Sequence, residues 1–336
     1  MKKKVLLTGA NGFLGQLAIK NLSEHYSLLC IDRVTNDSKV TKVDLNYFDE
    51  IDLFLKDKKI DIIIHFASDI FDTKKKNVYS NNVKSVSNLL KICKKYKINK
   101  FYFSSTFSIY ERNYNFLINE TEPISAKNIY GISKAESERI LLSSDSEISV
   151  IIFRLPIVVD VTRVHRLGIV FEFIKDGKKI FIPGKGDNKI QFVYAQDIFE
   201  CIRKSENLLG KKVYNLGCET NKSIKDVIEH VIKNANSKSK VILLPKGITL
   251  FLLKILTFFR LIDFTEYHNK ILTSNLVLDC NRVKKDLNFS SIYNSEEIFL
   301  KAYNYYCSNY SIIQKINSSS SKKPSMRFFN IIKYLS

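Results

Sequence analysis

The chain has 336 residues, 45% of them hydrophobic, which is enough to bury a large core in one domain or in two closely joined ones. Its six cysteines lie far apart without a CxxC pair and its five histidines form no recognisable ligand set. We therefore expect a reduced cytoplasmic protein with neither a disulfide framework nor a metal site. The formal net charge of +19 either favours anionic partners or reflects a lysine-rich surface, and because no nucleic-acid-binding signature accompanies it, nucleic acid is not an expected partner.

Short β-branched runs alternate with helical stretches in the first half of the chain. In chain order, we expect a strand at residues 3–8, a helix at 12–25, a strand at 26–32, a helix at 48–58, a strand at 61–66, a helix at 82–97, a strand at 100–105, a helix at 130–142 and a strand at 150–155. The strands are almost continuously apolar, which is typical of strands covered by helices on both faces. The alternation predicts an α/β fold with a Rossmann-type doubly wound parallel sheet.

The pattern loosens after about residue 155. We expect residues 1–155 to form the main sheet domain, completed by parts of the later chain. Residues 156–307 would mainly form a smaller C-terminal lobe that caps the carboxyl edge of the sheet, and residues 308–336 a basic tail.

Two late segments are candidates for contact with a membrane surface. Residues 248–264 are very apolar but include three charged side chains, whereas a membrane span needs roughly 20 mostly uncharged residues. On a helix, the apolar positions 251, 255, 258 and 262 share one face, which would pack in the smaller lobe or contact a membrane surface. The tail after residue 310 has five basic residues and no acid, so it would lie on anionic lipid or be a loosely docked terminus.

A glycine-rich turn follows the first predicted strand. In TGANGFLG, residues 8–15, glycines stand at positions 9, 12 and 15, and the segment opens a helix. Glycine allows a sharp turn and a close approach of the backbone to a pyrophosphate, and the helix N-terminus offers unpaired N–H groups to the phosphates. This strand–turn–helix context indicates a dinucleotide-binding site.

Asp32 and Arg33 bear on which dinucleotide binds. Asp32 ends the second predicted strand, 20 residues after Gly12, where a carboxylate can accept both hydroxyls of an adenosine ribose and would repel a 2′-phosphate. This favours NAD as the cofactor. The neighbouring Arg33 could accommodate the phosphate instead, so NADP is not excluded.

Tyr130 and Lys134 are the candidate catalytic pair. They stand four residues apart in YGISK, on one face at the start of a predicted helix. A tyrosine hydroxyl normally loses its proton at about pH 10, but a neighbouring ammonium and an oxidised nicotinamide both favour the phenolate. Tyr130 could then act as a base near neutrality, while Lys134 would also hold the nicotinamide ribose.

With these motifs in this order, the sequence resembles the extended short-chain dehydrogenase/reductase family, the group of sugar-nucleotide epimerases and dehydratases. The resemblance covers roughly residues 1–305. It implies that residues 1–155 bind NAD, that residues 156–307 mainly bind the substrate, and that two copies pair as a homodimer through the helices at 82–97 and 130–142. Further matches are Asp44-Leu45, HFAS at 65–68, NVKSVSNLL at 82–90, FYFSSTFSIY at 101–110, Arg154-Leu155-Pro156, GKGDNKIQFVYAQD at 184–197 and YNLG at 214–217.

The resemblance assigns roles residue by residue. Thr106, four positions before Tyr110, matches the family's catalytic Ser/Thr, whose hydroxyl would bond the substrate oxygen that Tyr130 deprotonates. Asp44 and Leu45 would flank the adenine, and Ala67 would line the path to the nicotinamide. The candidate catalytic residues are Thr106, Tyr130 and Lys134, and the candidate cofactor-binding residues are Gly9, Asn11, Gly12, Phe13, Leu14, Gly15, Asp32, Arg33, Asp44, Leu45, Phe66, Ala67, Ser68, Tyr130 and Lys134.

Two residues beside Thr106 narrow the implied chemistry. The family's 4,6-dehydratases have Asp-Glu at these positions and related decarboxylases have a Glu at the second, whereas this chain has Phe107 and Ser108. Neither side chain can protonate a leaving hydroxyl or abstract a carbon-bound proton. The resemblance therefore favours a C4-type epimerase or a one-way dehydrogenase or reductase over a dehydratase or decarboxylase.

Three functions follow as alternatives. The first is an NAD-dependent epimerase or dehydrogenase/reductase of an anionic substrate, a nucleotide-linked sugar. The second is a hydroxysteroid-dehydrogenase-like oxidoreductase of a hydrophobic alcohol or ketone, because Ile157 stands where the sugar-nucleotide enzymes usually have an Asn near the substrate diphosphate. The third is a non-catalytic NAD-binding protein, against which the complete set of Thr106, Tyr130 and Lys134 argues.

Overall fold

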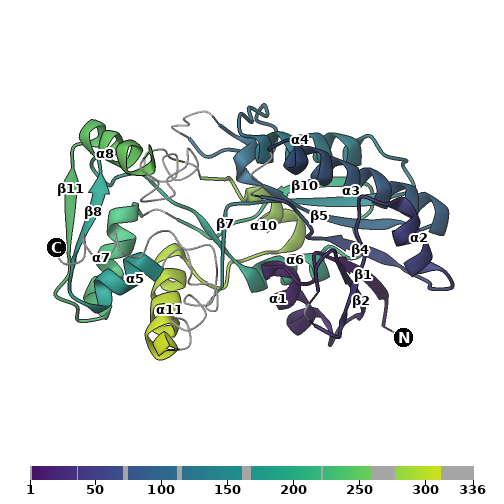
Figure 1. Ribbon diagram of the computed structural model, residues 1–336, viewed down its shortest axis with the longest axis horizontal. Coiled ribbons are helices and arrows are strands. Elements are labelled where there is room, and N and C mark those ends of the chain that lie inside the picture. Colours follow the sequence, from purple (N-terminus) through teal and green to yellow (C-terminus); the bar gives the residue numbers. More distant parts are fainter. Residues whose placement is uncertain are drawn as a thin grey trace.

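The computed structural model describes residues 2–35, 37–70, 75–111, 116–160, 168–220, 222–258, 275 and 277–311. A larger and a smaller lobe lie side by side along the longest axis of the molecule (Figure 1). The larger lobe contains a seven-stranded parallel sheet with the order β10-β6-β5-β4-β1-β2-β3. Its strands are β1 (Lys4–Thr8), β2 (Ser27–Asp32), β3 (Val40–Lys42), β4 (Ile62–His65), β5 (Lys100–Thr106), β6 (Ser149–Leu155) and β10 (Lys211–Asn215).

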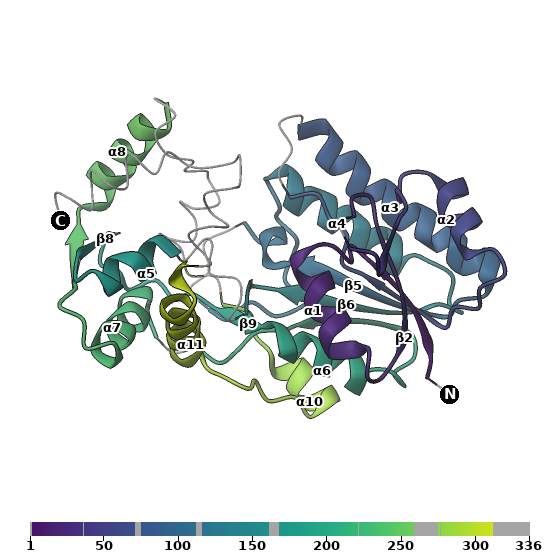
Figure 2. The same ribbon diagram turned by 60° about the horizontal axis from the view of Figure 1, so that its bottom comes forward.

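Helices cover both faces of this sheet (Figures 1 and 2). One face carries α1 (Phe13–Leu22), α6 (Ala195–Lys204) and α10 (Asn281–Leu287), and the other carries α2 (Phe48–Leu55), α3 (Lys75–Tyr96) and α4 (Ile129–Leu142). Successive side chains of a strand point to opposite faces of the sheet, so each strand contributes to both cores. Val5 and Leu7 pack in the core under α1 and α6, while Leu6 packs in the core under α2 and α3. The predicted doubly wound sheet is confirmed.

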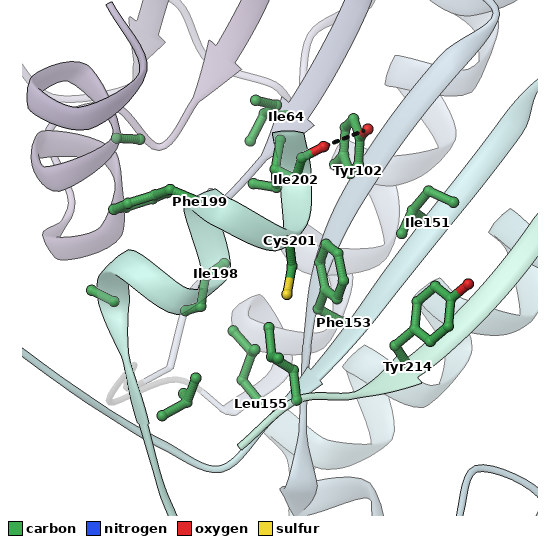
Figure 3. Close-up of a cluster of buried hydrophobic side chains, with 14 of the residues drawn as sticks. Ile64, Tyr102, Ile151, Phe153, Leu155, Ile198, Phe199, Cys201, Ile202 and Tyr214 are labelled. Carbon is green, nitrogen blue, oxygen red and sulfur yellow. Dashed lines mark hydrogen bonds between the residues drawn. The ribbon is translucent and has the colours of Figure 1, made fainter. Parts of the chain in front are cut away.

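The core under α6 joins parts of the chain that are far apart in sequence (Figure 3). Ile198, Cys201 and Ile202 of α6 are buried in one hydrophobic cluster with Phe153 of β6 and Tyr102 of β5. The Tyr102 hydroxyl donates to the main-chain oxygen of Ile202 at 3.0 Å, so this polar group is satisfied inside the apolar cluster. Residues after 156 thus contribute to the larger lobe through α6, β10 and α10.

Among the described residues, the smaller lobe combines two strand pairs with four helices. Its core contains a cluster of aromatic rings: the ring of Phe171 lies 5.2 Å from that of Phe299 and 5.8 Å from those of Tyr303 and Tyr306. Ring edges meet ring faces in most of these contacts, an arrangement that the aromatic quadrupole favours. The pairs are β7 (Ile157–Val159) with β9 (Phe192–Tyr194) and β8 (Lys179–Pro183) with β11 (Lys240–Leu244), and the helices are α5 (Gly168–Lys175), α7 (Ile224–Asn234), α8 (Lys246–Phe258) and α11 (Ser295–Ser308).

Several predicted boundaries were wrong. The first helix ends at Leu22 rather than at residue 25, and α3 begins at Lys75, seven residues before the predicted start. It ends one residue before Lys97, whose φ of 53° is left-handed and cannot continue the helix. The short edge strand β3 was not predicted, because three residues are too few for a periodic pattern.

Helix α8 is oriented differently from the prediction. Phe251 is 64% exposed, and Thr249 faces inward with its hydroxyl donating to the main-chain oxygen of Pro245 at 3.0 Å. The expectation that the face of Phe251 packs in the smaller lobe is therefore wrong for this residue. Helix α8 extends beyond the strand pair β8–β11 (Figure 2). Residues 259–264 and the tail from 312 to 336 lie outside the described residues.

Within the described ranges, none of the helices combines the length and the apolar character that crossing a membrane requires.

Candidate active site

A cavity of about 340 Å³ opens at the carboxyl ends of β1, β2 and β4, and we refer to it as the cleft. Parallel α/β sheets bind ligands at this edge. Of the predicted cofactor residues, Phe13, Leu14, Gly15, Tyr130 and Lys134 are not among those that line the cleft. The predicted residues that do line it are Gly9, Asn11, Gly12, Asp32, Arg33, Asp44, Leu45, Phe66, Ala67 and Ser68, and those that sequence reasoning missed are Ile31, Val34, Val43, Asn46, Asp69, Asn81, Asn82 and Ser85.

The glycine turn brings β1, α1 and the loop after β4 into close contact. Gly9 has a φ of 70°, and a Cβ there would lie 2.4 Å from the main-chain nitrogen of Ala67. A Cβ on Gly15 would lie 2.1 Å from the main-chain oxygen of Gly9. Gly12 is the N-cap of α1 and offers no side-chain cap. The bare backbone at the start of α1 therefore fits the pyrophosphate of a dinucleotide.

The carboxylate of Asp32 forms part of the wall of the cleft and is held by the backbone. One oxygen accepts the main-chain N–H of Asn11 at 3.0 Å, and the other accepts that of Val34 at 3.3 Å. Arg33, which left the choice between NAD and NADP open, forms an ion pair with Asp69 on the far side of the cleft. The carboxylate oxygens of Asp32 can accept the hydroxyls of the adenosine ribose of a dinucleotide, which fits this end of the cleft.

The turn that follows Thr106 and the helical turn that carries Tyr130 approach each other closely. Thr106 ends β5, and its hydroxyl oxygen accepts the main-chain N–H of Ser108 at 3.1 Å, which caps the 3₁₀ turn η1 (Phe107–Ile109). Asn128 caps α4 by accepting the N–H of Gly131 at 2.7 Å. A Cβ on Gly131 would lie 2.3 Å from the oxygen of Ser108, so the first turn of α4, with Tyr130, packs directly on the turn that follows Thr106.

Lys134 lies one turn after Tyr130 and is almost completely buried, at 2% exposed. Its ammonium nitrogen donates to the main-chain oxygen of Ser104 at 2.9 Å and lies 4.5 Å from the ring centroid of Phe103 and 5.9 Å from that of Tyr130. Burial lowers the pKa of Lys134 to about 7, against the opposing effect of Glu138.

His65 is a buried neighbour of this lysine. Its Nδ1 lies 2.7 Å from the hydroxyl oxygen of Thr8, and its ring stacks on that of Phe103 with centroids 5.8 Å apart. Burial, followed by the charge of Lys134, lowers the pKa of His65 to about 3. The imidazole is therefore neutral at physiological pH and acts as a packed polar group.

Asn82 connects the cleft to α4, the helix that carries Tyr130 and Lys134, and was not predicted as a site residue. It lines the cleft at 5% exposed, and its amide nitrogen donates to the hydroxyl of Ser133 at 2.9 Å and to the main-chain oxygen of Asp69 at 3.0 Å. Ser133 in turn donates to the main-chain oxygen of Tyr130 at 2.7 Å. An Asn on the inward face of a long helix is the signal that could have found it, because buried amides need partners.

No cluster of three or more His, Cys, Asp or Glu side chains with the geometry of a metal site occurs in the described part of the chain.

Comparison with known proteins identifies the family. The model of the NAD dependent epimerase/dehydratase family matches residues 5–217, which include the cleft, Thr106 and the start of α4. The chain belongs to this family. The resemblance inferred from the sequence motifs is confirmed, and the family is NAD-dependent.

Among the relatives of this chain, those whose names specify a reaction do not all specify the same one. An uncharacterized protein of Sinorhizobium fredii is 24% identical and covers 96% of the chain and 83% of its own length. A dTDP-D-glucose 4,6-dehydratase of Dictyostelium discoideum is 26% identical over 68% of the chain and 62% of that protein. A decarboxylating sterol-4-alpha-carboxylate 3-dehydrogenase of the same organism is 31% identical over 60% of the chain and 66% of that protein.

Solved structures of family members show the same fold. The NAD complex of the enzyme WbmG of Bordetella bronchiseptica matches with a TM-score of 0.74 at 18% identity, covering 92% of this chain and 95% of that one. The UDP-Glc/GlcNAc 4-epimerase of Campylobacter jejuni matches with a TM-score of 0.71 at 23% identity, covering 91% and 99%. Because dehydratases are among the relatives, membership of the family alone does not support the expectation that dehydration is disfavoured.

Proposed function

We propose that this chain binds NAD in the cleft and is an epimerase, or a one-way dehydrogenase or reductase, of a nucleotide-linked sugar. The observation that carries the proposal is the packing of the first turn of α4, with Tyr130, against the turn after Thr106, at the carboxyl end of β5. Lys134 lies within the same group of side chains. The cleft fits a dinucleotide at the adjacent strands of the same sheet edge.

In this mechanism the chain's own residues bind the substrate oxygen and move its proton. The hydroxyl of Thr106 orients the substrate oxygen, and the phenol of Tyr130 takes or returns its proton. The ammonium of Lys134, near the ring of Tyr130, lowers the cost of the phenolate and would hold the nicotinamide ribose. NAD, when bound, supplies the acceptor or donor of the hydride.

The side chains beside Thr106 favour a reaction that consists of hydride and proton transfer over a dehydration. Phe107 and Ser108 are both buried, and neither has a group that can act as acid or base at neutral pH. Dehydration needs a general acid for the leaving hydroxyl and a base for a carbon-bound proton. The same argument applies to decarboxylases that use a Glu at the position of Ser108.

A hydrophobic alcohol is the second candidate substrate. It is favoured by the likeness to a sterol dehydrogenase, by the half-buried Ile157 and by the exposed apolar residues Ile248 and Phe251 of α8. The net charge of +19 and the relatives whose names specify dTDP-D-glucose or UDP-glucose favour the nucleotide sugar.

The deciding experiment is native mass spectrometry of the purified protein, followed by release and identification of bound nucleotide. NAD that survives purification would support an epimerase, which must regenerate its cofactor in each cycle. An empty site that binds NAD only weakly would favour a one-way enzyme. Turnover assays with UDP- and dTDP-linked hexoses, and with a 3-hydroxysteroid as the alternative, then test the substrate class. A protein that binds neither NAD nor NADP would overturn the proposal.

A further inference from the structure

Arg33 and Asp69 form a bidentate ion pair within the wall of the cleft. One guanidinium nitrogen of Arg33 donates to Oδ2 of Asp69 at 2.9 Å, and the other lies 2.5 Å from Oδ1. Both residues line the cleft, Arg33 just after β2 and Asp69 in the loop after β4. Because strand β1 lies between β2 and β4, the pair reaches across the end of β1, above the glycine turn.

Asp69 is held in place by hydrogen bonds that do not involve Arg33. Its Oδ2 accepts the side-chain amide of Asn81 at 2.7 Å. Its main-chain N–H donates to Oδ1 of Asn82 at 2.8 Å, and its main-chain oxygen accepts the amide of the same residue at 3.0 Å. The side chain of Asp69 is 12% exposed and that of Arg33 is 51% exposed. Two asparagines of α3 therefore hold Asp69, and the more exposed guanidinium of Arg33 docks on its carboxylate.

The charge at this end of the cleft is negative. Among the described residues that line the cleft, the carboxylates are those of Asp32, Asp44 and Asp69, and the only cation is Arg33. The hydrogen bond to Asp69, followed by the charges of Asp69, Asp44 and Asp32, raises the pKa of Arg33. The guanidinium thus stays protonated, with two of its donors occupied by a carboxylate.

We propose that Asp69 determines cofactor selectivity by engaging Arg33, the one cation among the described residues that line the cleft, so that Arg33 is not available to a 2′-phosphate and NAD is selected over NADP. The inference rests on the proposed binding of a nicotinamide dinucleotide in the cleft. A 2′-phosphate placed near Asp32 meets a set of carboxylates that is only partly neutralised. It can gain Arg33 only by displacing Asp69, which would leave that carboxylate without its cation.

The test is calorimetric titration of NAD and NADP into protein freed of bound nucleotide. In Asp69→Asn, Arg33 loses its partner and becomes available to phosphate, so we expect NADP affinity to rise about tenfold, the effect of one charge-assisted hydrogen bond. NAD affinity should change by less than about threefold. The matched control is Asp57→Asn, which removes the same charge from an exposed, left-handed position at the end of α2 where Asn is equally tolerated. It should change neither affinity.

Two further variants separate the outcomes. Arg33→Ala in the Asp69→Asn background should abolish the gain in NADP affinity, because the cation that receives the phosphate is gone. If Asp69→Asn folds poorly, Asp69→Ser provides the same test, because it too removes the carboxylate that binds Arg33. An unchanged ratio of NADP to NAD affinity in the folded variants would overturn the role of Asp69 while leaving NAD binding intact. Binding of neither nucleotide to the wild type would overturn the proposed function itself.

Discussion

The carboxylate of Glu138 and the guanidinium of Arg154 form a buried ion pair behind the candidate catalytic residues. Arg154 donates through Nη2 to Oε2 at 2.7 Å and through Nε to both oxygens at 3.1 and 3.2 Å, and the two side chains are 1% and 5% exposed. Ser105 also donates to Glu138, and Tyr110 accepts from Arg154. Since Glu138 lies one turn after Lys134, this cluster ties α4 to the ends of β5 and β6.

Glu138→Ala should destabilise the protein by about 3–5 kcal/mol, because it leaves the guanidinium of Arg154 buried without its counter-ion. Urea unfolding measures the loss. Glu136→Ala on the same helix is the matched control: its ion pair with Arg139 is exposed, at 26% and 68%, and should contribute at most about 1 kcal/mol. Equal losses in the two variants would contradict the role assigned to burial.

Tyr130→Phe removes only the phenolic oxygen from the first turn of α4. We expect turnover to fall by roughly 10²–10⁴-fold, the usual contribution of a general acid or base, while NAD affinity changes little. Tyr79→Phe on α3 is a control for the loss of a half-exposed tyrosine hydroxyl and should keep full activity. Wild-type turnover in Tyr130→Phe would remove this residue from the mechanism and favour a non-catalytic NAD-binding protein.

The parts of the fold that the sequence predicted depend on local signals. The alternation of apolar runs and helical stretches is local, and so is the TGANGFLG turn, so the sheet and the position of the cleft could both be predicted. Thr106 and the YGISK segment are far apart in sequence. Their joint role was predicted from the family resemblance and not from any pattern in the residues.

The unpredicted parts depend on contacts between distant residues. Asp69 and Arg33 are 36 residues apart and meet only because of the order of the strands. Glu138 and Arg154 come from a helix and a strand whose spacing gives no sign that they pair. The exposure of Phe251 was misjudged for a related reason: a helical pattern identifies an apolar face, whereas the elements around the helix decide what covers it.

Gly131→Ala tests the close approach of α4 to the turn after Thr106. The added methyl group would lie 2.3 Å from the oxygen of Ser108, so α4 must shift, and we expect a loss of about 1–3 kcal/mol in stability. Displacement of Tyr130 by about 1 Å would reduce turnover by roughly 10²-fold. In Gly247→Ala on α8 the new methyl meets no atom of the described residues within 4 Å, and stability should be equal or slightly higher. A fully active Gly131→Ala protein would show that the two turns need not touch.

Asp197 provides a test of how pH affects stability. It is completely buried at the start of α6, where Oδ1 accepts the N–H of Ile292 at 3.1 Å and Oδ2 has no partner among the described residues. Burial raises the pKa of this carboxyl from 3.8 to about 7, a direction that the hydrogen bond from Ile292 opposes. The folded protein therefore keeps this proton until about pH 7, whereas the unfolded chain loses it near pH 4.

Stability attributable to Asp197 should consequently be present below pH 4 and decline as the pH rises to about 7. Each unit of pKa difference corresponds to about 1.4 kcal/mol. Asp197→Asn keeps an oxygen for Ile292 and cannot ionise, so its stability relative to the wild type should increase across this interval and level off above pH 7. Thermal unfolding of both proteins from pH 4 to 8 measures the difference in stability between them. The titration of His65 and of the other groups that both proteins share cancels in this difference. A constant difference over that range would mean that the Asp197 carboxylate is already ionised in the folded protein at pH 4.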